Sequence, residues 1–94
     1  MNNIILKQKT PIEIANAIAK RIRTSRKRMK LSQQALSDKS DVSLGSIKRF
    51  ERSGEISLLS LTKIAIALKC DNELERIFTE RKFESIQEVL DEQG

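Results

Sequence analysis

Apolar side chains recur every three or four residues along most of the chain, and this spacing predicts a series of α-helices. The first should cover about residues 11–30, because Thr10 can cap its start, Pro11 suits the first turn and Glu13 completes a capping box. The predicted core-facing stripe of this helix consists of Ile14, Ala15, Ile18, Ile22, Ser25 and Met29. Arg26 falls on the border of the stripe rather than on the solvent-facing side.

Four shorter helices should follow, at about residues 33–40, 44–52, 58–69 and 72–79. Each begins after a side chain that can accept a hydrogen bond from a free backbone N–H; these caps are Ser32, Ser43, Ser57 and Asp71. Asp41 tolerates left-handed backbone geometry, which predicts a tight turn between the second and third helices. In the fourth helix the predicted core residues are Leu58, Leu61, Ile64, Ala65 and Leu68. The stretch SIQE at 85–88 is another capping box and predicts a sixth short helix.

The composition favours one small all-α domain with an aliphatic core. The chain has 94 residues, of which 38% are hydrophobic, with three Phe, no Trp and no Tyr. Pro and Gly together number four, too few for a sandwich or barrel with many turns. The single cysteine, Cys70, rules out an intramolecular disulfide and fits a reducing cytoplasm. Neither a signal peptide nor a membrane-spanning segment is expected, because apolar runs are short.

The charge is divided along the chain. Residues 1–70 hold 15 Lys and Arg against five Asp and Glu, whereas residues 71–94 hold three against eight. This division indicates a basic body that binds a polyanion and an acidic tail that stays away from it.

The residue types disfavour catalysis. The chain has no His, which is the usual acid–base group and the commonest metal ligand. It has no glycine-rich phosphate loop, and Cys70 has no His partner to activate it. We therefore expect no enzyme activity, no cofactor, no metal and no small-molecule ligand.

The second and third predicted helices, separated by a tight turn, have the layout of a helix-turn-helix. Four of their residues should point inward: Leu36, Val42, Ile47 and Phe50. The stretch LSQQALSDKSDVSLGSIKRFERSGEISLLSLTKIAIAL resembles the Cro/repressor (XRE) type of helix-turn-helix. It has Leu-Ser-Gln at its start, Val-Ser before the third helix, Ile-x-x-Phe-Glu-Arg at the end of that helix, and the later Ser-Leu-x-x-Leu-x-x-Ile-Ala-x-Ala-Leu run. The resemblance covers roughly residues 14–79. It places Cys70 where the family tends to have an apolar residue, which implies that this side chain fills the core.

The sequence departs from the family pattern at a few positions that leave the fold intact. Asp41 stands where the family usually has glycine, and Ala35 where it usually has glutamate. Ser37 and Ser40 replace the usual alanines, which should soften the second helix slightly. The predicted fold is a five-helix Cro/repressor-like bundle with a short C-terminal helical tail. Its predicted divisions are an N-terminal arm (1–9), a DNA-binding domain (10–79, with the motif at 33–52) and an acidic tail (80–94).

The resemblance implies that the third helix enters the major groove of double-stranded DNA while the second helix braces it on the backbone. Gln33 and Gln34, at the start of the second helix, resemble the family's phosphate and base-edge contacts; the alternative is a polar first turn that faces water. Ser43 is expected mainly to cap the third helix, although its hydroxyl can also touch the DNA backbone. Ser46 either contacts DNA or has a purely structural role, and the sequence favours neither.

Helical geometry places the candidate DNA-reading residues of the third helix on the side opposite its core face. They are Leu44, Gly45, Lys48, Arg49 and Arg52. Gly45 either clears space for base edges or a phosphate, or is simply tolerated in a first turn. Leu44 either contacts a thymine methyl group or packs sideways against its neighbours. The three cations either contact DNA or are solvated surface, and Lys48 is the preferred candidate for a base contact.

Arg26 and Glu51 are predicted to form a structural ion pair. Both lie at the margins of apolar faces, and the family resemblance pairs an arginine late in the first helix with the glutamate that ends the third. A DNA contact by Arg26 is the alternative.

Apolar residues outside the predicted core indicate a protein contact. They are Leu59, Ile66, Phe83, Ile86, Val89 and Leu90. These residues either pack across a homodimer, which we favour because this fold commonly reads paired half-sites, or form a lid within one chain.

The function predicted from the sequence is a cytoplasmic, sequence-specific repressor that binds a palindromic operator as a homodimer. The alternative is an antitoxin that binds a toxin or another regulatory protein and also regulates its own operator.

Overall fold

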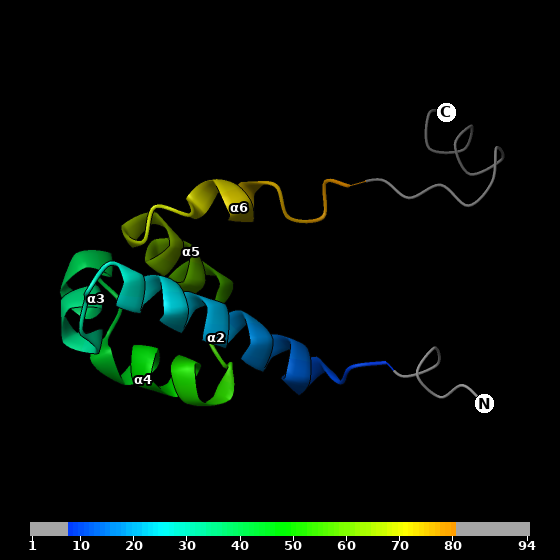
Figure 1. Cartoon of the computed structure of the whole chain (residues 1–94), viewed down its shortest axis with the longest axis horizontal. Coiled ribbons are helices and arrows are strands. Elements are labelled where there is room, and N and C mark those ends of the chain that lie inside the picture. The colour runs from blue at the N-terminus through cyan, green and yellow to red at the C-terminus, as the bar shows by residue number, and fades with distance from the viewer. Residues whose placement is uncertain (1–7, 81–94) are drawn as a thin grey trace, which may run out of the picture.

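The computed structural model of the chain describes residues 8–80, and within them it is all-helical (Figure 1). The helices, labelled as in Figure 1, are α2 (Pro11–Arg28), α3 (Gln33–Ser40), α4 (Leu44–Ser53), α5 (Leu58–Ala67) and α6 (Asp71–Glu75). This confirms the predicted all-α bundle of five helices. The predicted helix at 85–88 lies outside the described residues.

The helix starts follow the local sequence. Thr10 and Glu13 form the predicted capping box, in which the Thr10 hydroxyl accepts from the Glu13 N–H and the Glu13 carboxylate accepts from the Thr10 N–H. Ser32, Ser43 and Ser57 cap α3, α4 and α5 by accepting from the backbone N–H three residues on. Asp41 ends α3 in the left-handed conformation, with φ 60°. These ends were predictable because each depends on neighbouring residues alone.

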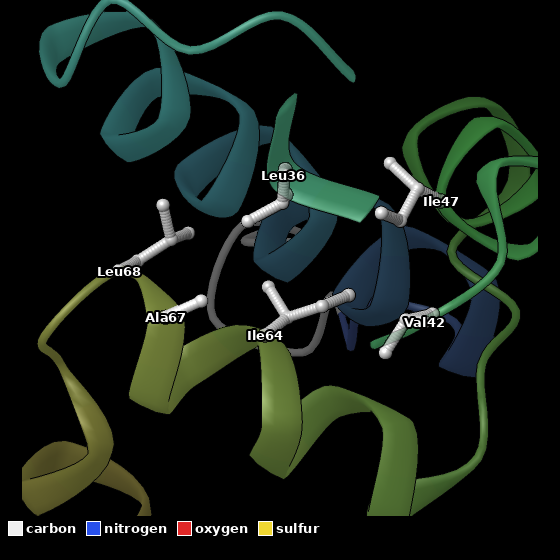
Figure 2. Close-up of a cluster of buried hydrophobic side chains, with 6 residues drawn as sticks. All are labelled: Leu36, Val42, Ile47, Ile64, Ala67 and Leu68. Carbon is white, nitrogen blue, oxygen red and sulfur yellow. The ribbon is translucent and has the colours of Figure 1, made fainter. Parts of the chain in front are cut away.

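The core forms where α3, α4 and α5 meet (Figure 2). Its buried cluster consists of Leu36, Val42, Ile47, Ile64, Ala67 and Leu68. Phe50, which was also predicted to point inward, is buried as well. Cys70 is half-buried and packs against the cluster, as expected for a core-filling residue.

The buried face of α2 overlaps the predicted stripe, since Ile22 and Met29 pack against the core, but it is rotated from the centre of that stripe. Ala19 and Arg26 are its buried residues, whereas Ile14 is exposed. The reason is the small side chains on that side of α2, which let α4 approach closely. Gly54, at the end of α4, lies so near that a Cβ atom there would be 2.9 Å from the Ala15 backbone.

Two predictions for the C-terminal half were wrong. Leu58 was expected in the core, but 72% of it is exposed, because the first turn of α5 lies at the edge of the helix packing. The fifth helix was expected to begin after a cap at Asp71 and to reach residue 79. Instead Asp71 is its first residue, Cys70 precedes it without a side-chain cap, and it ends at Glu75. After Glu75 the chain forms a turn. Phe78 has a φ of 63°, a left-handed conformation that is incompatible with a right-handed helix.

Candidate nucleic-acid interface

Helix α4 is fixed on one side by core packing and at its start by a cap. Ile47 and Phe50 are buried, so they set the rotation of the helix about its axis. The Ser43 hydroxyl accepts from the Ser46 N–H at 3.1 Å and donates to the Ser46 hydroxyl at 2.8 Å. Both hydroxyls therefore take part in the cap in the free protein.

The opposite side of α4 is exposed and basic. Its exposed residues include Gly45, Ser46, Lys48, Arg49 and Arg52. Leu44 is half-buried, so part of its side chain packs against the protein and part meets solvent. On an α-helix, these candidate DNA-reading residues lie on the side away from Ile47 and Phe50.

Gly45 is not required by packing within residues 8–80. Apart from its chain neighbours and the adjacent backbone of α4, no atom of the residues that the structure describes lies within 4 Å of the position that a Cβ would take there. Its φ is not in the left-handed region either, which distinguishes it from Gly54. Glycine at this position therefore leaves open space on the basic surface of α4.

Arg26 and Glu51 join α2 to the end of α4 through a bidentate ion pair. Arg26 Nε donates to Glu51 Oε2 at 2.7 Å and Nη2 donates to Oε1 at 2.9 Å, while Nη1 donates to the Leu31 carbonyl at 2.7 Å. The side chains are 9% and 4% exposed, so the pair is largely shielded from solvent. With all these partners inside the protein, Arg26 acts as a brace between helices.

Glu51 also orients Gln33, through a contact that was not predicted from the sequence. Gln33 Nε2 donates to Glu51 Oε1 at 3.1 Å, which holds the first side chain of α3 against α4. Burial raises the pKa of Glu51, but the hydrogen bonds from Arg26 and Gln33 and the charges of Arg26 and Arg23 outweigh it, so the pKa lies below its usual value. The carboxylate is therefore ionised at neutral pH and remains an acceptor for both partners.

A shallow recess opens beside this network. It is lined by Arg23, Arg26, Ser32, Gln33, Lys48, Glu51 and Arg52. Arg23 was not among the predicted site residues, although it lies one helical turn before Arg26 and its Nε is 3.9 Å from Glu51 Oε1. That spacing was the signal that could have found it. With the N-terminus of α3 at one edge and three exposed cations around it, the recess has the chemistry that attracts a phosphate group.

Two other candidate residues have partners within the protein. Gln34 Nε2 donates to Asp38 Oδ1 at 3.0 Å, one turn further along α3. Arg49 forms an ion pair with Glu55, with 3.0 Å between Arg49 Nη2 and Glu55 Oε1, and both side chains are more than half exposed. Sequence reasoning did not identify Glu55, because the pair forms across the chain reversal at Gly54.

Comparison with known protein families identifies the motif. Residues 22–71, more than half of the chain, match the family described as helix-turn-helix. The chain belongs to the helix-turn-helix family of the Cro/repressor (XRE) type. No curated protein matches it significantly. Members of this family are DNA-binding transcription regulators, and so is this protein.

In this helix-turn-helix protein, the match covers the ion pair, the recess and helices α3, α4 and α5. The apolar residues Leu59 and Ile66 are exposed on α5. The other predicted contact residues, Phe83, Ile86, Val89 and Leu90, lie outside the described residues.

Two further features concern the described part of the helix-turn-helix protein alone. Residues 8–80 contain no group of three or more His, Cys, Asp or Glu side chains placed to hold a metal ion. None of the helices there is both long enough and apolar enough to cross a membrane.

Proposed function

We propose that the protein is a repressor that reads a two-fold symmetric operator as a homodimer. In this proposal residues 10–79 form the DNA-binding domain, and α4 enters the major groove. The protein would act by occupying its operator, without catalysis or a cofactor. The observation that carries the proposal is the exposed basic face of α4, with the open space at Gly45 beside Lys48.

The proposed contacts follow from where the side chains lie. Lys48 and Arg49 read base edges or adjacent phosphates, and Gly45 lets the helix start approach the groove floor. Leu44 presents its exposed part to a thymine methyl group. Arg52 contributes to phosphate binding, while Ser43 and Ser46 serve chiefly as the cap.

The second helix of the motif supplies the backbone contacts in this proposal. Gln33 contacts a phosphate from the position in which Glu51 holds it, and Gln34 lies beside it at the same helix start. The free N–H groups at the start of α3 favour an anion there. Arg26 remains a structural residue, because its donors are engaged by Glu51 and Leu31.

The proposed dimer uses apolar side chains that the bundle leaves exposed. Leu59 and Ile66 are 68% and 59% exposed, and they lie two turns apart on α5. With the apolar residues of the tail (80–94) they supply a contact between two copies. Two linked copies would set the spacing between half-sites at about one turn of DNA.

Selection from a randomised duplex library by the purified full chain tests the proposal. We expect a palindrome with half-sites about one helical turn apart, and relaxed preference at one position with Lys48→Ala. Arg76→Ala is the control, because it removes an exposed cation beyond α6 and should leave the selected sequence unchanged. Binding without any enriched sequence would contradict the proposal.

A second candidate function is an antitoxin that binds a toxin protein and its own operator. The observation that favours it is the extent of exposed apolar surface on and after α5, where Leu58, Leu59, Ile66, Ile77 and Phe78 are all exposed. Sedimentation of the pure protein separates the two functions. A dimer that Leu59→Ser converts to a monomer supports the self-contact, whereas a monomer in both cases leaves the surface for another protein.

A further inference from the structure

Helices α5 and α6 border an apolar groove on the surface. Its lining residues are Leu58, Thr62, Ile66, Asp71, Leu74, Glu75 and Ile77. Aliphatic side chains make up most of the lining, and Leu58, Ile66 and Ile77 are exposed there. Such a surface is stabilised when other apolar side chains cover it.

The groove has two acidic side chains in its lining, which select among possible occupants. Asp71 and Glu75 both belong to α6 and both line the groove, and no lining residue is basic. A complementary segment therefore combines aliphatic side chains with positive charge. The tail at 81–94 contains four apolar residues but carries four acidic residues against two basic ones, so its net charge opposes docking here.

The N-terminal arm has the matching chemistry. Its sequence, MNNIILKQK, places Ile4, Ile5 and Leu6 directly before Lys7 and contains no acidic residue. We propose that residues 4–6 occupy the α5–α6 groove of the same chain, with Lys7 beside the carboxylates of Asp71 and Glu75.

The arm and the path from the start of α2 to the groove have comparable lengths. Gly54 lies against Ala15, one turn into α2, and four residues later the chain reaches Leu58, which lines the groove. At ~1.5 Å per helical residue and ~3.4 Å per extended residue, Leu58 lies within roughly 25 Å of Pro11. Ile4 can extend about 24 Å from Pro11 by the same measure. Figure 1 shows the start of α2 and the segment that follows α6 leaving the bundle on the same side of the view.

This contact would connect the segment before α2 to α6, which is a helix of only 5 residues. It covers the part of Ile66 that faces the groove. Leu59 does not line the groove and stays available for the proposed dimer. The inference does not depend on DNA binding, so it can be tested on the free protein.

Methyl NMR on the full chain with labelled isoleucine tests the inference. We expect NOEs from the methyl groups of Ile4 or Ile5 to those of Ile66 or Ile77. Glu75→Lys should weaken or abolish these NOEs, because it places a positive charge beside Lys7. Glu73→Lys is the matched control: it makes the same charge change on α6, but Glu73 does not line the groove, so the NOEs should persist.

Other occupants of the groove give distinct results that overturn the inference. NOEs from Ile86 to the groove would assign it to the tail. NOEs seen only between differently labelled copies in a mixed sample would assign it to a second molecule. If the arm shows no NOEs to the groove and its signals shift only when DNA is added, the arm is a DNA contact. Loss of the NOEs in Glu73→Lys as well as Glu75→Lys would reject the charge pairing.

Discussion

Glu51 accepts hydrogen bonds from Arg26 and Gln33 at once, so the residue that ties α2 to α4 also positions the first side chain of α3. One carboxylate thus connects three helices of the motif. A change at Glu51 should therefore affect both the stability of the bundle and the placement of Gln33. The nearby exposed pair of Arg49 and Glu55 offers a comparison, since it has similar chemistry without burial.

Replacing Glu51 with glutamine should destabilise the fold strongly. Glu51→Gln keeps the shape but leaves the Arg26 charge largely buried without a counterion, which costs about 3 kcal/mol of unfolding free energy. Urea unfolding followed by circular dichroism measures the change.

The control is Glu55→Gln, which breaks the exposed pair. Its effect on unfolding should be below about 1 kcal/mol, because solvent already screens both charges. Equal losses in the two variants would mean that burial of the Arg26–Glu51 pair has no energetic consequence.

Stability should fall in acid in a way that depends on Glu51. Because its pKa is lower in the folded chain than the ordinary value of 4.5, the unfolded state binds more protons at acidic pH. The resulting stabilisation is complete above about pH 4.5 and is lost as the pH falls through the folded pKa. Urea unfolding at a series of pH values from 7 to 3 should show this loss.

The same series on Glu51→Gln isolates the group responsible. The variant should lose less stability between pH 5 and 3 than the native chain, because glutamine does not titrate. Some acid sensitivity should remain, since the hydrogen bonds from Thr10 also lower the pKa of Glu13. Identical pH profiles for the two proteins would show that Glu51 is not the source.

The sequence predicted most features that depend on neighbouring residues and missed several that depend on packing between helices. The serine caps and the Asp41 turn were predictable because their hydrogen bonds span a few residues. The Gln33–Glu51 contact was not, since it requires the relative positions of α3 and α4. Leu58 was misassigned for the same reason: an aliphatic residue at the edge of a helix face is buried only if another element covers it.

The two glycines of the α4 region should respond oppositely to alanine. Gly54 has φ +79° and lies against the Ala15 backbone, so Gly54→Ala should cost about 2 kcal/mol or more in unfolding free energy. Gly45 is helical with open space around it, and Gly45→Ala should stabilise the fold by roughly 0.5–1 kcal/mol. Thermal unfolding of both variants measures the difference.

Gly45→Ala also separates stability from binding. If Gly45 clears space for DNA, the variant should bind its selected duplex more weakly although it is more stable than the native chain. Unchanged affinity together with higher stability would mean that the glycine is simply tolerated in the first turn of α4.

Glu55 should compete with DNA for the guanidinium of Arg49. Arg49 Nη2 lies 3.0 Å from Glu55 Oε1, and Arg49 is on the surface of α4 that is proposed to meet DNA. When Arg49 binds a phosphate, its guanidinium must either leave Glu55 or contact both anions. Glu55→Gln should tighten DNA binding, and Arg49→Ala should weaken it and reduce the salt dependence by about one counterion.

A double-mutant cycle, measured by fluorescence anisotropy at several salt concentrations, distinguishes this competition from a general effect of charge. If Glu55 acts by holding Arg49, adding Glu55→Gln to Arg49→Ala should give little further gain. An equal gain in both backgrounds would mean that Glu55 repels DNA directly and that its pairing with Arg49 has no role in binding.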